Sequence, residues 1–208
     1  MLINADFSQR VHINTAAAPW VPSPMAGVER KMLDRIGAES GHATSIVRYQ
    51  PGSYFSPHTH DGGEEFLVLE GVFSDEHGDY PAGTYVRNPI GTTHKPYSDP
   101  GCTIFVKLWQ FSQDDRRQFS VDTLTSPVSP LHQHGPETVR LLDLEADEKV
   151  TFPQALRQYE ILMLSGTLTD GTTRLQASSW LRSPAKEELL LHAVTHTRCL
   201  IKTFDLDA

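Results

Sequence analysis

Short apolar runs, each broken by turn-forming residues, make up most of the chain. Between Val28 and Phe111 the runs 45–49, 65–69, 84–87 and 103–109 are rich in β-branched and aromatic residues, and Gly, Pro, Asp and Ser separate them. Many short runs of this kind with evenly spaced turn residues are typical of an antiparallel sandwich or barrel. Helical periodicity is almost lacking. The pattern therefore predicts an all-β protein.

The second half of the chain repeats the first at an offset of 95 residues. The run EFLVLEG at 65–71 falls on EILMLSG at 160–166. The same offset, without a gap, superimposes four further pairs of identical residues: Asp75 and Asp170, Arg87 and Arg182, Pro89 and Pro184, Lys107 and Lys202. Such a repeat predicts two copies of one β unit in tandem. We place the first at residues 1–112, including an extended lead-in of 27 residues, and the second at residues 113–208, with a connecting segment at 113–130.

Composition and charge exclude several classes of function. The formal net charge is −8, the pI is about 5.6, and no run of Lys or Arg stands out, which argues against nucleic-acid binding. No stretch of eighteen apolar residues and no signal-like N-terminus is present, so we expect a cytoplasmic protein without a membrane partner. Cys102 and Cys199 lie in apolar strand-like runs, and we expect two buried free thiols.

One stretch carries the pattern of a metal site. Residues 58–64 read HTHDGGE, and His94 follows thirty residues later after a strand-and-turn pattern. Two histidines one residue apart on a strand point to the same face, and the glycine pair turns Glu64 back towards them. Three imidazoles and one carboxylate are a ligand set for one divalent transition metal. We therefore predict that His58, His60, Glu64 and His94 bind the metal.

The repeat separates the first copy from the second at this site. At the offset of 95 residues, apolar or aromatic residues occupy the four ligand positions, namely Pro153, Ala155, Tyr159 and Leu189. We therefore expect a metal-free second copy with a filled interior, and one metal per chain. Glu65 recurs as Glu160 whereas Glu64 does not, so Glu64 is assigned to the metal and Glu65 to the fold. We expect Glu65 to form a partly buried ion pair with Arg87 or Lys107.

Other residues are weaker candidates for a site. His132 and His134 share the spacing of His58 and His60 but lack a following carboxylate, and His192 and His196 lack a glutamate in register. A set of aromatic residues is either core or the lining of a ligand pocket above the metal: Tyr49, Phe55, Phe66, Tyr85 and Trp109. Tyr85, Arg87 and Lys107 are the polar groups that we consider as anchors in such a pocket.

The motif positions resemble those of the cupin superfamily, whose two motifs carry nine residues at these intervals: Gly52, His58, His60, Glu64, Gly71, Gly83, Pro89, Gly91 and His94. Residues 20–112 in particular resemble the ChrR-type cupin. The resemblance implies a bicupin of two jelly-roll barrels, with zinc expected at the four ligands and Fe, Ni or Mn as alternatives. In ChrR proteins this cupin follows a small helical zinc domain that binds a sigma factor, which gives these proteins their anti-sigma-factor function. The lead-in here has only His12 and no cysteine, which puts direct sigma-factor binding in doubt.

Two functional hypotheses follow from the site and the resemblance. The first is a regulatory or sensor protein of the ChrR type, responding to singlet oxygen or peroxide or to a small-molecule ligand. The second is a metal-dependent dioxygenase that cleaves a diketone or hydroxy-ketone, similar to acetylacetone-cleaving cupins. The enzyme requires a substrate-sized, mostly apolar cavity with a polar anchor, whereas the sensor does not. The resemblance also implies a homodimer.

Overall fold

The computed structural model describes residues 1–38, 40–126, 129–152, 156–186 and 188–205, and every regular element in these ranges is a β-strand. The all-β prediction is thus confirmed for the described residues. They contain no helix that is long and apolar enough to cross a membrane. Two compact units divide the chain: Met1–Ala5 with Pro19–Pro127, and Asp6–Ala18 with Val128–Ala208.

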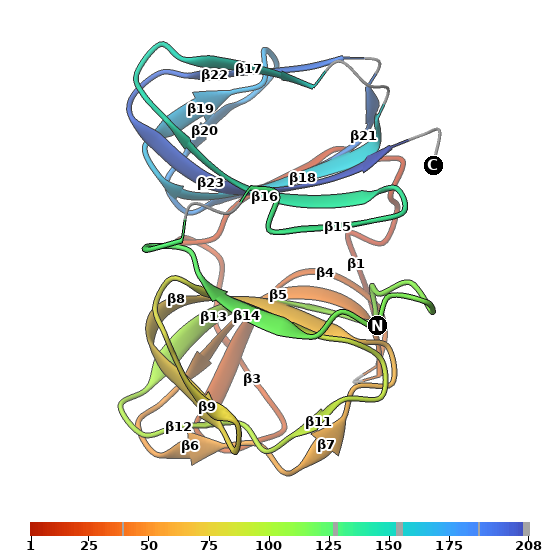
Figure 1. Ribbon diagram of the computed structural model, residues 1–208, viewed down its shortest axis with the longest axis vertical. Helices are drawn as coiled ribbons and strands as arrows, with labels where there is room; N and C mark the ends of the chain where they lie inside the picture. Colours follow the sequence, from red (N-terminus) through yellow and green to blue (C-terminus); the bar gives the residue numbers. More distant parts are fainter. Residues whose placement is uncertain (39, 127–128, 153–155, 187, 206–208) are drawn as a thin grey trace. The chain divides into compact units, whose positions relative to one another are not determined.

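The first unit is built on one long antiparallel sheet with the strand order β1-β4-β5-β13-β8-β10-β14, most of whose strands are labelled in Figure 1. These strands are β1 (Leu2–Ile3), β4 (Val28–Gly37), β5 (Gly41–Tyr49), β13 (Cys102–Leu108), β8 (Glu64–Asp75), β10 (Thr84–Asn88) and β14 (Phe119–Asp122). Four short strands pair along its edges and ends: β3 (Val21–Pro22), β6 (Ser53–Tyr54), β9 (Gly78–Pro81) and β12 (Tyr97–Ser98). A separate ribbon joins β7 (His58–Thr59) to β11 (Thr93–His94).

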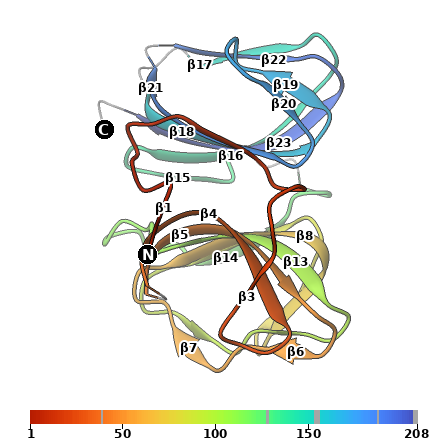
Figure 2. The same ribbon diagram turned by 180° about the vertical axis from the view of Figure 1, so that it is seen from behind.

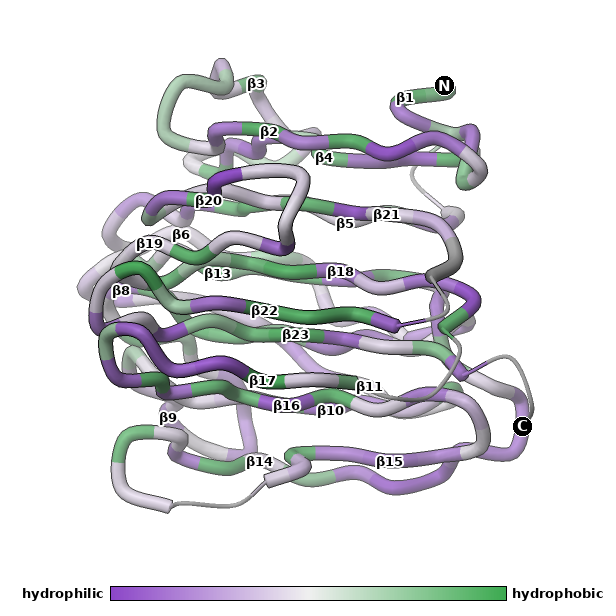
Figure 3. Tube along the Cα trace, turned by 90° about the horizontal axis from the view of Figure 1, so that it is seen from above, coloured by the Kyte–Doolittle hydropathy of each residue, from purple (hydrophilic) through white to green (hydrophobic). Residues whose placement is uncertain are grey.

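The second unit consists of two antiparallel sheets whose facing sides form one core. The larger has the order β15-β16-β23-β18-β21-β2 and the smaller β17-β22-β19-β20. The strands are β2 (Val11–Asn14), β15 (His132–His134), β16 (Glu137–Leu144), β17 (Lys149–Phe152), β18 (Leu156–Ser165), β19 (Thr167–Thr169), β20 (Arg174–Gln176), β21 (Ser179–Lys186), β22 (Leu189–Ala193) and β23 (Thr197–Asp205). Hydrophobic stretches in β22 and β23 are visible in Figure 3. Buried residues from both sheets pack together in this core.

Strand registers confirm the repeat. Arg87 and Lys107 both lie opposite Glu65 on the neighbouring strands, and Arg182 and Lys202 lie opposite Glu160 in the same way. The central order β5-β13-β8-β10 of the first unit corresponds to β16-β23-β18-β21 of the second. Each unit therefore has the same central sheet, shifted by 95 residues in sequence.

Residues from the N-terminal segment complete the sheet of the second unit. Strand β2 pairs with β21, with Val11 opposite Arg182, and Figure 2 shows this red segment running across the second unit. In the first unit the equivalent position beside β10 is taken by β14, from the segment that connects the repeats. Residues 6–18 thus group with the second unit and residues 113–127 with the first. The predicted boundary between residues 112 and 113 does not match this division. The reason is that β2 pairs with β21 and β14 pairs with β10, so each segment joins a unit other than the one predicted for it.

Candidate metal centre

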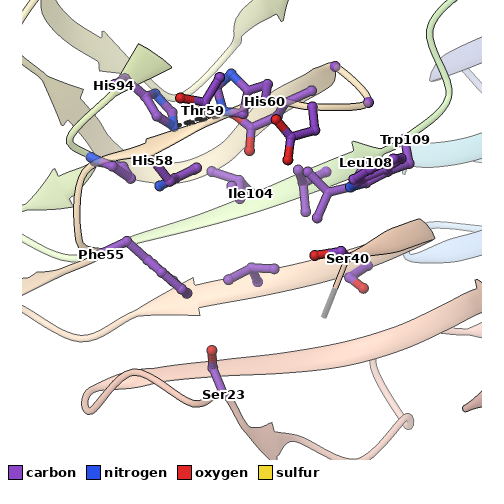
Figure 4. Close-up of a pocket in the computed structure, with 18 of the residues that line it drawn as sticks. Ser23, Ser40, Phe55, His58, Thr59, His60, His94, Ile104, Leu108 and Trp109 are labelled. Carbon is purple, nitrogen blue, oxygen red and sulfur yellow. Dashed lines mark hydrogen bonds and ion pairs between the residues drawn. The ribbon is translucent and has the colours of Figure 1, made fainter. Parts of the chain in front are cut away.

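Four predicted ligands from separate segments of the first unit lie together. Strand β7 pairs with β11 so that His58 is directly opposite His94, and His60 follows just after β7. Glu64 begins β8. One ligand atom from each of the four residues lies within 4.8 Å of the others. Figure 4 shows the three histidine rings converging at one end of a cavity.

Each histidine is oriented by an acceptor at its Nδ1 atom. The Nδ1 atom of His58 is 2.9 Å from the carbonyl oxygen of Ser56, that of His60 is 3.0 Å from Thr92 Oγ1, and that of His94 is 3.3 Å from Asp75 Oδ2. The hydroxyl of Thr92 itself donates to the carbonyl of Pro89, so it accepts from His60. Nδ1 is then the protonated nitrogen, and Nε2 is left with its lone pair for a metal ion.

The free nitrogen atoms meet at close range. His60 Nε2 lies 3.2 Å from His94 Nε2, and Glu64 Oε1 lies 3.4 Å and 3.6 Å from these two atoms. With both Nδ1 atoms protonated, the two Nε2 atoms direct lone pairs at each other. A shared cation satisfies both of them and the carboxylate, so the residues present fit a divalent metal of the kind that imidazole and carboxylate groups bind.

The turn before Glu64 requires its two glycines. A Cβ atom on Gly62 would lie 2.3 Å from the Trp109 ring, and one on Gly63 would lie 2.4 Å from Phe111. Gly63 also has a φ of 77°, a backbone conformation that residues with a side chain rarely adopt. Any larger residue here would displace the chain that brings Glu64 to the histidines.

Charge around Glu64 keeps this buried carboxyl ionised. Burial raises the pKa of Glu64, but His60, His94 and His58 outweigh that effect, and a hydrogen bond from Asn88 adds to theirs, so the pKa lies below its usual value. Burial lowers the pKa of His60 more than Glu64 raises it, and its net pKa is lowered. These two shifts favour a carboxylate at Glu64 and a neutral imidazole at His60, the forms that bind a metal. Burial lowers the pKa of His94, but its hydrogen bond to Asp75 and the charge of Glu64 outweigh burial and raise that pKa, so a metal ion has to displace a proton there.

A cavity of about 390 Å³ opens from the ligands into the unit. Its walls include Tyr49, Phe55 and Trp109 from the predicted aromatic set. Phe66 instead packs in the apolar core. Apolar and aromatic side chains share the lining with serines, charged residues and the histidines, and a concave site of this size with both kinds of group can hold a small molecule.

The predicted anchors of the pocket lie elsewhere. Arg87 donates 2.7 Å hydrogen bonds to Glu65 and Asp115, and Tyr85 donates to Glu65 at 2.5 Å. These residues and Lys107 project from the sheet face opposite to Glu64, because successive strand residues alternate. Tyr85, Arg87 and Lys107 are therefore not among the residues that line the cavity. The expected ion pair between Glu65 and Arg87 is confirmed.

In the second unit, the two described ligand equivalents are both buried in its core. Tyr159 and Leu189 belong to one hydrophobic cluster, whereas Pro153 and Ala155 lie outside the described residues. The Tyr159 hydroxyl donates to Asp170, and Arg10 binds both. The Arg10 guanidinium and the Tyr159 phenol thus both donate hydrogen bonds to Asp170, the residue of the second repeat that corresponds to Asp75.

The remaining histidines do not form a second site among the described residues. His132 and His134 stack with their ring centroids 6.5 Å apart, and no group of three or more ligands forms around them in the described part of the chain. His192 and His196 each face an exposed aspartate, at 3.6 Å and 2.9 Å.

Sequence reasoning missed three residues near the site. Asp75, which orients His94, had a detectable signal because it recurs as Asp170 at the repeat offset. Arg30 and Arg35 line the cavity from β4. No sequence motif links these two arginines to the predicted ligands. They reach the cavity because β4 pairs with β5 in the sheet.

Several solved structures have the same fold, and one of them holds a metal ion. Bacterial pirin YhhW from Escherichia coli, in complex with nickel(II), is 14% identical, covers 95% of this chain and 99% of its own, and has a TM-score of 0.74. A candidate dioxygenase from Nostoc punctiforme is 15% identical and covers 97% and 85%, with a TM-score of 0.73. An oxalate decarboxylase from Bacillus subtilis is 12% identical and covers 95% and 77%, with a TM-score of 0.56. At these identities the likeness shows the fold, a two-unit cupin.

No curated protein sequence matches the chain. A family model described as the ChrR cupin-like domain matches residues 8–112, just over half of the 208 residues. The match spans all four ligands, the turn that positions Glu64 and the strands around the cavity. By this match, the chain belongs to the family of ChrR cupin-like domains.

Proposed function

We propose that this protein is a metal-dependent cupin dioxygenase that acts on a small substrate with oxygen donor atoms, such as a diketone or hydroxy-ketone. The observation that carries the proposal is the cavity of about 390 Å³, which has all four ligands in its wall. A protein that holds a metal only for structural reasons has no need of a substrate-sized space beside it. The candidate dioxygenase with the same fold is consistent with this function.

The chain's own residues would carry distinct parts of this activity. His58, His60, Glu64 and His94 would hold the ion, which when bound supplies positions for a chelating substrate and for dioxygen. Tyr49, Phe55 and neighbouring apolar side chains would exclude water from the reacting atoms. Asp75 would keep the His94 ring in place.

Oxygen consumption tests the proposal. Protein stripped with a chelator would be loaded separately with Fe(II), Mn(II), Ni(II) or Zn(II) and mixed with pentane-2,4-dione or a hydroxy-ketone. We expect uptake of one O₂ per substrate with a redox-active ion, with both oxygen atoms recovered in the cleavage products. The His58→Ala variant, which lacks one ligand, is the control. No uptake above this variant with any ion or substrate would contradict the proposal.

The family match favours a second candidate function, a zinc-bearing regulator in the response to singlet oxygen or peroxide. Burial raises the pKa of Cys102 to about 11 and that of Cys199 to about 12, so neither thiol is suited to sense an oxidant. A sensor would then respond through the metal centre. We would expect zinc release or a change of association state, as monomer, homodimer or sigma-factor complex, when peroxide is added. If peroxide changed neither the zinc content nor the association state of the protein, this function would be excluded.

A further inference from the structure

We infer that Tyr49 is a substrate-binding residue of the cavity, and that its hydroxyl donates a hydrogen bond to an oxygen atom of a molecule held at the metal centre. The substrate class is thereby narrowed to molecules that present a carbonyl or enolate oxygen to this hydroxyl. The inference rests on the proposed function and gives Tyr49 a part in it beyond the exclusion of water.

Tyr49 is the last residue of β5, and it lies in the wall of the cavity. Ser45 and Val47 of the same strand also line the cavity, because alternate residues of a strand project from one face. Their partners on the neighbouring β13, Val106 and Ile104, belong to the same wall. This face of β5 is therefore directed into the cavity, with Tyr49 at its end.

The Tyr49 hydroxyl forms no hydrogen bond with the described part of the chain, although the residue is only 6% exposed. Some described side-chain atoms without a partner are sealed from solvent, and this oxygen is not one of them, so it is open to the cavity. Burial of a hydroxyl without a partner is unfavourable. The partner of this hydroxyl therefore has to come from the contents of the cavity.

Two aromatic rings connect Tyr49 with the metal centre. The Tyr49 ring packs against Phe55, with centroids 5.8 Å apart, and against Phe73 at 5.7 Å. Phe55 lies 6.4 Å from the His58 ring, as Figure 4 shows, and Phe73 lies 6.0 Å from the His94 ring. A single ring thus separates Tyr49 from each of two predicted ligands, so a molecule of a few atoms bound at the metal centre can reach its hydroxyl.

The Tyr49 phenol acts as a donor because it stays protonated. Burial raises the pKa of Tyr49 well above its usual value, and Glu64 and Cys102 add to this effect. A neutral phenol donates its proton to an acceptor such as a carbonyl or enolate oxygen. An enolate is the stronger acceptor of the two, because hydrogen bonds to charged groups are stronger than those between neutral groups.

Calorimetry with pentane-2,4-dione on the zinc-loaded protein tests the inference, because this binding does not depend on turnover. The Tyr49→Phe variant removes only the hydroxyl and keeps the ring between Phe55 and Phe73. We expect it to bind the diketone roughly 5- to 30-fold more weakly than the wild type, as for the loss of one hydrogen bond. Its zinc affinity should be unchanged, and its urea midpoint in the presence of a chelator should not fall, because the hydroxyl has no partner in the described protein.

The Tyr85→Phe variant is the matched control. The Tyr85 hydroxyl donates to Glu65 at 2.5 Å, and Tyr85 is not among the residues that line the cavity. This variant should have a lower urea midpoint and should bind the diketone as the wild type does. Undiminished diketone binding by Tyr49→Phe, weaker binding together with an equal loss of zinc affinity or of stability, or no binding to the wild type would overturn the inference.

Oxygen uptake separates this outcome from failure of the dioxygenase proposal. Diketone binding that depends on the Tyr49 hydroxyl, without uptake with any ion, would leave Tyr49 as a ligand-binding residue and remove only the dioxygenase function. Uptake by the wild type together with undiminished binding by Tyr49→Phe would remove only the role of Tyr49.

Discussion

Two adjacent glutamates on β8 should respond in opposite ways to the same substitution. Glu64→Gln removes one of the four predicted metal ligands, and Glu65→Gln removes a partner of Arg87 on the other face of the sheet. The two changes are identical in chemistry and one residue apart. Any difference between them therefore arises from the direction in which each side chain points.

The structure sets the size of each effect. The Glu65 carboxylate is 2% exposed and accepts hydrogen bonds from Tyr85 at 2.5 Å and from Arg87 at 2.7 Å. Loss of one partner from a buried pair costs about 3–5 kcal/mol, but glutamine retains an acceptor oxygen and Arg87 keeps Asp115, so we expect about 2–3 kcal/mol. Within the described part of the metal-free protein, the Glu64 carboxylate has a long 3.4 Å hydrogen bond from Asn88 and two nearby imidazoles, so Glu64→Gln should change stability by less than about 1 kcal/mol.

Two assays on each variant separate the roles. Urea unfolding in the presence of a chelator gives the stability of the metal-free protein, and zinc titration gives the metal affinity. Glu64→Gln should weaken zinc binding at least about 100-fold, since even partners of ligands contribute 10- to 100-fold. Glu65→Gln should bind zinc nearly as tightly as the wild type. Destabilised Glu64→Gln with normal zinc affinity, or stable Glu65→Gln without zinc, would refute the assignment of the two faces.

Three further predictions follow from contacts around both units. Asp75→Asn should weaken zinc binding by about 10- to 100-fold with little change in stability, because Asp75 orients His94 through Nδ1, and calorimetry would show unchanged affinity if that contact were unimportant. Cys102 and Cys199 should react with a thiol reagent only after unfolding, since burial raises their pKa values to about 11 and 12, and rapid labelling of native protein would be inconsistent with their environment. Despite burial, which acts the other way, hydrogen bonds lower the pKa of Asp170 to about 2, so its contribution of about 2 kcal/mol is complete above pH 4 and is lost as pH falls from about 4 to 2. The stability difference between wild type and Asp170→Asn should shrink over that range, and a constant difference would contradict the shift.

The predictions from sequence were most successful where they depended on residues that are close together in the chain or that recur at the repeat offset. His58 and His60 share a face because they are two residues apart, and Glu64 joins them through a glycine turn that the same short stretch encodes. The repeat assigned Glu65 to the fold because it recurs as Glu160 where the ligands do not, and the register of its partners confirms this.

Features that depend on distant pairing could not be predicted in this way. Strand β2 joins β21 across more than 160 residues, and no pattern in Val11–Asn14 indicates its partner. The sequence does not show on which face of its strand the Arg87 side chain lies, and so it also allows Arg87 as a pocket anchor, which the register of β10 on β8 excludes. Arg30 and Arg35 reach the cavity only because β4, with a register shift between Met32 and Asp34, lies beside β5.

The number of metal ions per chain is the decisive test of a single metal centre in the first unit. The protein would be purified without a metal-affinity tag, and its metal content would be measured by elemental analysis per folded chain, for the wild type and for Glu64→Gln. We predict about one divalent transition metal per wild-type chain and strongly reduced content in the variant, because the four predicted ligands lie together in the first unit and other residues stand at their positions in the second. Two metals per chain, or equal content in the variant, would contradict it.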